Sequence, residues 1–219
     1  MIRLLVFIVA LLVAACGDEP QPEAPAEIPI ATLPGVYAGQ FPCQECSAIP
    51  TTLWLRADAR FFLKQEYGET EESDAMSVYS FGRWQWRKED GLLALRGEGP
   101  DRLFARPDED ALVMQTRAEL EHRLNRDPAA PAFVAVTKMS GTIRLGGDVA
   151  TFTECLTELG APLSRGGDYR KFLHQYRSAG AGRKMVFVEL EGRFLWAEND
   201  SPQTFRIDRF ITIKSDGSC

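Results

Sequence analysis

The chain has 219 residues, with 25 Lys and Arg against 31 Asp and Glu, and a formal net charge of −6 at pH 7. Its basic residues form no stripe, so nucleic acid is not an expected partner. The length allows one large or two small domains, and no apolar run after the N-terminus is long enough to predict a transmembrane helix.

The N-terminus carries an export signal. Arg3 and the amino group precede an apolar run over residues 4–13, which is too short for a stable membrane anchor. The run ends in Leu-Val-Ala-Ala before Cys16, a pattern that resembles a bacterial lipobox. We therefore expect residues 1–15 to be a lipoprotein signal peptide and Cys16 to be the lipidated (palmitate-bearing) N-terminus. The alternative is an ordinary secretory signal followed by an incidental cysteine.

A linker is predicted over residues 16–34, which are rich in proline and glutamate. Such a segment buries too little apolar surface to fold, so we expect it to hold a globular body clear of the lipid surface. Gly17 follows the lipidated cysteine where an aspartate would stand in a retained lipoprotein. In a Gram-negative cell this resemblance to sorted lipoproteins implies the outer membrane, with the protein facing the periplasm.

The first folded unit is predicted over residues 35–127, with short strands at roughly ten-residue spacing. Residues 51–56 and 60–64 flank a turn and predict a hairpin, and residues 80–87 alternate apolar and polar. The series predicts an all-β, mainly antiparallel barrel or sandwich. Four aromatic residues are expected to build the barrel core, the alternative being the lining of a ligand cavity: Tyr79, Phe81, Trp84 and Trp86. Residues 119–125 are too short for a clear helix prediction.

The second unit is predicted over residues 128–219, after a boundary at Pro128-Ala-Ala-Pro131. One helix is indicated by Asp168 as N-cap and by an apolar stripe that starts at Tyr169 and continues through Phe172, Leu173 and Tyr176. Strand-like segments precede and follow this helix. The order matches an OB-like barrel, although its third strand, near residues 162–163, has a weak signal.

The four remaining cysteines suit disulfides in a compartment outside the cytoplasm. Cys43 and Cys46 form a C-x-x-C turn, which can serve as a small-loop disulfide, a redox pair or two soft ligands for Cu(I). A redox catalyst usually has its C-x-x-C at the start of a helix, but Pro50 disfavours a helical conformation just before it. Glu45 would raise a thiol pKa, so a thioredoxin-like catalyst is not expected. The other two readings stay open.

Cys155 and Cys219 form the other candidate pair. Cys219 is the last residue, and a bond to Cys155 would pin the final strand to the barrel. The bond would close a loop of roughly 65 residues, for which the chain-entropy model gives about 4 kcal/mol of stabilisation. We therefore expect the second unit to depend on oxidative folding.

Catalysis is not expected. His122 and His174 are the only histidines and lie in different predicted units, which leaves little for general base catalysis or for a zinc site. The methionines show no copper-type clustering. No nucleophile triad, phosphate loop or metalloprotease motif occurs in the chain.

Residues 35–53 resemble the signature G-x-Y-x-G-x-x-P-C-x-x-C-x-G-I-x-T-x-L of the NlpE-type copper-homeostasis outer-membrane lipoproteins. The match departs at Ala48, where the family has glycine. Residues 82–84 are similar to the family's G-x-W strand, and residues 150–155 with residues 167–169 resemble the OB-like domain of its longer members.

This resemblance implies a lipocalin-like N-terminal barrel, an OB-like C-terminal barrel and a sensor of envelope stress, whether in lipoprotein trafficking, oxidative folding, surface adhesion or copper supply. It implies signalling to the inner-membrane kinase of a Cpx-type two-component system. Further implied partners are the lipoprotein processing and sorting machinery and the disulfide-forming enzymes. By carry-over, Cys43 and Cys46 are the copper- or redox-responsive pair, and Cys155 and Cys219 the C-terminal disulfide. The alternative function is a periplasmic Cu(I) buffer that uses Cys43 and Cys46, without an obligatory cofactor.

Overall fold

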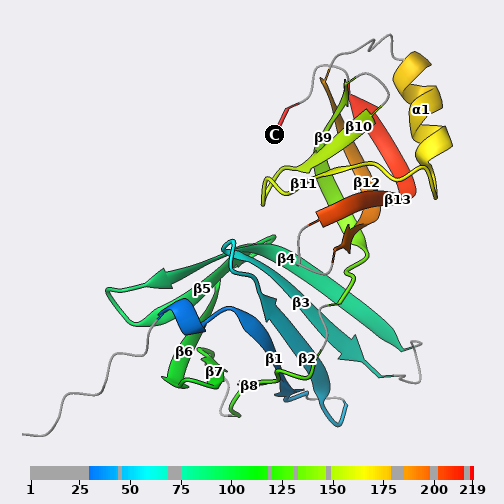
Figure 1. Ribbon diagram of the computed structural model, residues 1–219. Helices are drawn as coiled ribbons and strands as arrows, with labels where there is room; N and C mark the ends of the chain where they lie inside the picture. Colours follow the sequence, from blue (N-terminus) through cyan, green and yellow to red (C-terminus); the bar gives the residue numbers. More distant parts are fainter. Residues whose placement is uncertain are drawn as a thin grey trace, which may run out of the picture.

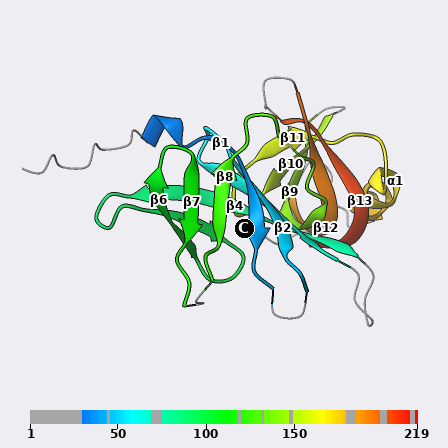
Figure 2. The same cartoon turned by 90° about the horizontal axis from the view of Figure 1, so that it is seen from below.

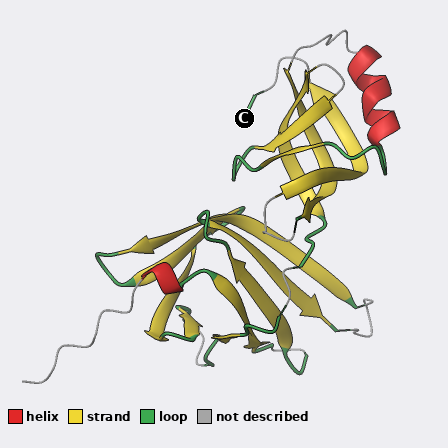
Figure 3. Cartoon of the chain, viewed as in Figure 1, coloured by secondary structure: helices red, strands yellow, loops and turns green. Residues whose placement is uncertain are grey.

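The computed structural model describes residues 30–43, 46–68, 75–117, 120–130, 133–146, 149–178, 185–197, 202–214 and 218–219. The predicted signal peptide, Cys16 and most of the linker lie outside these residues. The described helices include none with the length and apolar character needed to span a bilayer. In the described part of the chain, strands dominate both domains, and one α-helix lies on the second (Figures 1 and 3).

The first domain is a closed up-and-down barrel in which strands adjacent in sequence pair antiparallel. Its strands are β1 (Gly35–Phe41), β2 (Ile49–Leu55), β3 (Arg60–Tyr67), β4 (Met76–Arg87), β5 (Leu92–Gly97), β6 (Arg102–Asp108), β7 (Ala111–Met114) and β8 (Arg123–Arg126). The predicted hairpin is confirmed as β2 and β3. The barrel confirms the all-β class of the first unit.

Side chains that alternate along the strands fill the barrel. In β2, Leu53 and Leu55 lie in the inner core and Trp54 lies outside it. The inner core is a single apolar cluster, to which every strand except β4 contributes a fully buried residue: Leu33, Tyr37, Phe41, Leu53, Leu55, Phe61, Leu63, Leu93, Leu95, Phe104, Leu112 and Leu124. This cluster stabilises the barrel by removing apolar surface from water.

The barrel closes where β1 pairs with β8, which Figure 2 shows side by side. Gly39 permits this approach, because a Cβ atom there would lie 2.2 Å from the carbonyl oxygen of Arg123. Strand β8 occupies part of the segment for which the sequence predicted no clear element. Its four residues are too few to give a period, and only the pairing with β1 and β7 makes them a strand.

A short 3₁₀ helix, η1 (Ile30–Thr32), leads the chain into the barrel. Leu33, directly after it, is fully buried in the inner core. The Tyr37 hydroxyl donates to the Leu33 carbonyl oxygen at 2.9 Å, and Arg126 donates to the carbonyl oxygens of Thr32 and Pro34. The last residues of the predicted linker are therefore part of the folded barrel.

The second domain contains β9 (Thr137–Gly146), β10 (Val149–Glu154), β11 (Gly160–Pro162), β12 (Met185–Trp196) and β13 (Pro202–Lys214). Their order in the sheet is β11-β10-β9-β12-β13. A parallel bridge between Leu163 and Phe205 brings β11 against β13 and curls the sheet round. The predicted OB-like order, with the helix between the third and fourth strands, is confirmed, and the weak third strand is the short β11.

Helix α1 (Tyr169–Ser178) covers the sheet with its predicted apolar stripe, in which Phe172 and Tyr176 are buried. Asp168 holds the predicted N-cap position, because its carbonyl oxygen accepts the N–H of Phe172 at 2.9 Å. Its carboxylate accepts the backbone N–H of Phe210 at 2.9 Å. This second bond joins the start of α1 to β13, so the capping residue also serves tertiary packing.

Candidate functional site at the domain junction

The four cysteines of the two domains pair within their own domains. Cys43 and Cys46, with Cα atoms 5.2 Å apart, form one disulfide directly after β1. Cys155 and Cys219, 5.3 Å apart, form the second. Cys155 follows β10, and its N–H donates to the Ser140 carbonyl oxygen at 3.0 Å. The second bond therefore ties the end of the chain to the β9–β10 end of the OB-like domain.

Residues 154–159, which we name the Cys155 turn, are organised by a buried carboxylate. Glu154 is 2% exposed and accepts the N–H of Leu156 at 2.9 Å and the N–H and hydroxyl of Thr157 at 2.6 Å each. Glu158 adopts a left-handed conformation with φ of 56°. Buried charges of this kind persist where hydrogen bonds satisfy them, so this turn has one defined shape.

Two arginines of the first barrel bind the Cys155 turn. Arg60 Nε and Arg83 Nη2 each donate to the Thr157 carbonyl oxygen at 2.9 Å. Arg83 also donates to the Leu156 carbonyl oxygen at 3.3 Å and forms an ion pair with Glu158 at 2.6 Å. Arg60 and Arg83 are register partners on β3 and β4, which places both guanidinium groups at one point. The turn that carries a disulfide cysteine is thus also a contact between the two domains.

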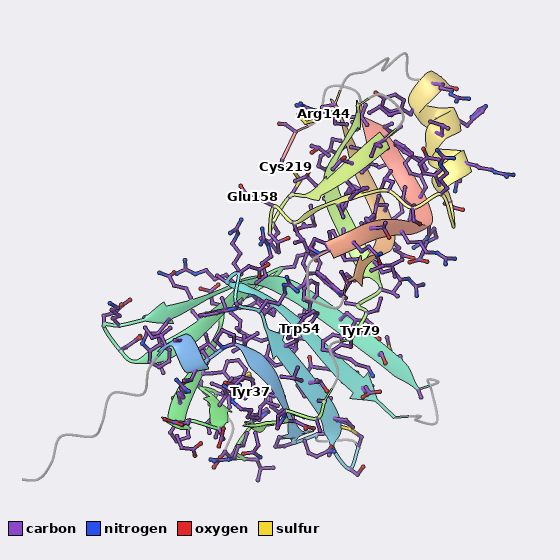
Figure 4. All side chains as sticks on the ribbon, in the orientation of Figure 1. Tyr37, Trp54, Tyr79, Arg144, Glu158 and Cys219 are labelled. Carbon is purple, nitrogen blue, oxygen red and sulfur yellow. A yellow bond between two sulfur atoms is a disulfide. The ribbon has the colours of Figure 1, made fainter. Side chains whose placement is uncertain are left out.

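Aromatic rings form the rest of this contact. Trp54 and Phe62, on the outside of the first barrel, lie edge-on to Trp196 with ring centroids 5.2 and 5.3 Å apart. Phe133, which precedes β9, packs against Trp54 and Tyr79 at 6.4 and 6.2 Å. Figure 4 shows Trp54 and Tyr79 on the side of the barrel that faces the second domain. One apolar cluster therefore runs continuously from the barrel surface into the OB-like core.

Arg56 lies between two of these rings, with its guanidinium carbon 5.0 Å from the Trp54 ring centroid and 4.5 Å from that of Trp196. Asp58 accepts hydrogen bonds from Arg56 and from Arg60. Partial burial raises the pKa of Asp58, but the hydrogen bonds and charges of Arg56 and Arg60 outweigh this and hold the pKa below its usual value. Asp58 is thus a fixed negative charge that orders two of the junction arginines.

The prediction that the four aromatic residues of β4 build the barrel core is correct for two of them and wrong for the other two. Trp84 and Trp86 pack against the inner core as expected. Phe81 and Tyr79 lie on the opposite face, at the junction. The sequence does carry one signal for this second buried face. Residues 53–55 and 61–63 are apolar without interruption, as in strands that are covered on both sides.

Metal binding by the C-x-x-C pair would require reduction, because a disulfide offers no thiolate. Reduction would leave two thiols on residues whose Cα atoms lie 5.2 Å apart, and two such soft ligands are the kind that Cu(I) prefers. Among the described residues, no three His, Cys, Asp or Glu side chains form a group that could hold a metal ion. His122 lies edge-on to Phe41, with centroids 4.9 Å apart, and its Nδ1 lies 3.0 Å from the Leu120 carbonyl oxygen.

Comparisons with known proteins agree with this division. The NlpE N-terminal domain family matches residues 37–122, and the NlpE C-terminal OB domain family matches residues 133–219. Lipoprotein NlpE of Escherichia coli (strain K12) is 29% identical over 169 residues, which cover 74% of this chain and 69% of that protein. The crystal structure described as the Cpx pathway activator NlpE from Escherichia coli aligns with 85% of this chain and 97% of its own, at 23% identity and a TM-score of 0.35.

Proposed function

Because this chain belongs to the NlpE lipoprotein family, we propose that it is an outer-membrane lipoprotein that senses envelope stress and signals to a Cpx-type two-component system. The Escherichia coli relative is described as a Cpx pathway activator. The observation that supports a sensing role here is the position of the Cys155–Cys219 bond. It ties Cys219 to the OB-like domain and lies in the turn that contacts the first barrel, so one bond is connected to both domains.

In this proposal the chain is anchored through lipidated Cys16 and carried to the outer membrane by the lipoprotein processing and sorting machinery. When lipid processing, sorting or disulfide formation fails, the first barrel is presented at the inner membrane and engages the sensor kinase. The disulfide-forming enzymes of the periplasm supply the resting, oxidised state. Surface adhesion and copper are further stimuli in the same scheme.

The test is Cys219→Ser in cells with a Cpx-dependent reporter. We expect higher reporter output than with the unchanged chain while export and lipidation stay intact, because the OB-like domain loses the closure that oxidation supplies. Cys43→Ser/Cys46→Ser is the matched control, which removes a disulfide from the other domain. Unchanged output from Cys219→Ser at equal protein abundance would contradict the redox part of the proposal.

The second candidate function is a Cu(I) buffer at Cys43 and Cys46. It is supported by the closeness of these residues, whose reduced thiols would lie side by side without refolding. Alkylation and mass spectrometry of the mature, membrane-extracted protein under non-reducing conditions separate the two functions. Free Cys43 and Cys46 beside a bonded Cys155–Cys219 pair, with lower copper tolerance for Cys43→Ser and unchanged signalling, would favour the buffer. Two bonded pairs would favour the sensor.

A further inference from the structure

We propose that the outer face of β2–β4 is a docking surface for an acidic, aromatic segment of a partner protein, and that the OB-like domain occupies it as an internal competitor. We name this surface the junction face, and its residues are Trp54, Arg56, Arg60, Phe62, Tyr79, Phe81 and Arg83. The inference rests on the proposed function, because the partner is the one to which the chain signals.

The apolar half of the junction face is more extensive than a monomeric barrel requires. Trp54, Phe62 and Phe81 are 4%, 2% and 6% exposed, yet none of them belongs to the inner core of the barrel. The inner cluster already gives the barrel its own core. If the OB-like domain moved away, a contiguous aromatic patch would be exposed, and such patches mark protein-binding sites.

The charged half of the junction face determines which partner would fit. The OB-like domain meets Arg60 and Arg83 with two carbonyl oxygens and the Glu158 carboxylate, and it meets Arg56 with the Trp196 ring. Guanidinium groups bind carboxylates and stack on aromatic rings. A competing segment would therefore present an acidic residue on an exposed turn next to an aromatic side chain.

The OB-like domain buries the centre of this face but leaves one of its polar atoms without a hydrogen bond. Arg56 is 8% exposed, and its Nη1 has no hydrogen-bond acceptor among the residues that the structure describes. An open pocket of about 400 Å³ lies beside Arg56, and all of its lining residues belong to the first barrel: residues 34–35 and 54–58. A buried donor without an acceptor lowers the stability of the state that contains it. A partner that supplied a carboxylate here would satisfy a group that the internal cover leaves unbonded.

The contacts that hold the OB-like domain on the junction face are also ones that a competing partner could replace. In the Arg83–Glu158 pair the side chains are 42% and 76% exposed, and ion pairs this open to water contribute little. The Cys155–Cys219 bond lies in the same turn, one residue from Leu156. In this proposal, loss of the bond loosens the turn and weakens its hydrogen bonds to Arg60 and Arg83.

Two variants break the same ion pair from opposite sides, and they test the proposal in the full-length chain. Glu158→Arg opens the junction and leaves the junction face intact. Arg83→Glu opens it and reverses a charge on the face itself. We expect Glu158→Arg to raise the Cpx-dependent reporter by about two- to fivefold, the range for a surface ion pair, and Arg83→Glu to leave it unchanged or lower it. The charge-swapped double variant should return to the closed state, with output no higher than the unchanged chain.

A second matched pair uses the rings. Trp196→Ala uncovers the junction face from the OB-like side, and Trp54→Ala uncovers it while removing one of its own rings. Small-angle X-ray scattering of each purified protein should show equal domain separation, and circular dichroism should show that both domains remain folded. We expect an increase of about tenfold in reporter output for Trp196→Ala, and little or none for Trp54→Ala.

The outcomes separate this inference from the proposed function. If both members of each pair raise the reporter output equally, the junction has only a structural role and the docking proposal is wrong. If all four variants open the junction and none changes the output, while overproduction of the unchanged chain still activates the reporter, the docking surface is again wrong and the proposed function stands. If overproduction of the unchanged chain has no effect on the reporter, the proposed function itself fails.

Discussion

The two barrels of this chain close in different ways. In the first, β1 pairs with β8 through backbone hydrogen bonds, and Arg126 adds bonds to Pro34 and Tyr37. In the second, the ends of the sheet meet through one parallel bridge between Leu163 and Phe205, and a disulfide holds the end of the chain. The first closure involves no disulfide, because the Cys43–Cys46 bond lies in the loop after β1. The second domain adds a disulfide that joins the two ends of a long loop, so we expect it to depend on oxidation more than the first domain does.

The two disulfides close loops of very different length. Cys43 and Cys46 are 3 positions apart, and Cys155 and Cys219 are 64 positions apart. In the chain-entropy model the longer loop restricts the unfolded chain far more. The long bond is therefore expected to matter to the fold of its domain, and the short one mainly to the loop that contains it.

The largest expected effect comes from Cys219→Ser. The OB-like domain should lose about 4 kcal/mol of unfolding free energy, and the first barrel should keep its own stability. Urea unfolding of the full chain, followed by near-UV circular dichroism, should show the second-domain transition moving to lower urea and the two transitions separating. A parallel shift of both transitions would show that the barrels do not differ as the closures imply.

The double variant Cys43→Ser/Cys46→Ser should have a smaller effect on the first barrel. The four-residue loop gives about 2 kcal/mol at most in the same model, and the β1–β8 pairing and inner core remain. The same urea experiment should show a small decrease in the first transition and none in the second. A loss larger than that of Cys219→Ser would reverse the comparison between the two bonds.

The smallest effect concerns Asp58 and acid. Because Arg56 and Arg60 lower the pKa of Asp58 in the folded state, its ionised form adds stability above the ordinary aspartate pKa. This contribution is lost as pH falls through the lowered pKa. Asp58→Asn should therefore cost below about 1 kcal/mol near neutral pH and flatten the fall in unfolding free energy toward about pH 3. Asp101→Asn, at an exposed ion pair with Arg96, is the control and should leave the slope of the unchanged chain.

Local sequence patterns predicted several elements correctly, because each of these elements has a clear apolar pattern within its own short segment. The β2–β3 hairpin has apolar runs on both sides of a short turn, and α1 has four apolar residues on one stripe. The OB-like order followed from the position of that helix between strand-like segments. Strand β8 and the side of Phe81 were not predictable in this way, because a four-residue strand has no readable period and alternation does not say what covers the outer face.

By itself, the sequence determined the chemistry available to this protein: a predicted lipidated export signal, four further cysteines, two β-rich units and one amphipathic helix. These follow from composition and from periods that act over a few residues. Only the tertiary structure decided that the Cys155 turn meets Arg60 and Arg83, and that Trp54 faces Trp196 rather than water. Those contacts join residues about 75 to 140 positions apart, and packing between domains leaves no fixed spacing in the chain from which they could be predicted.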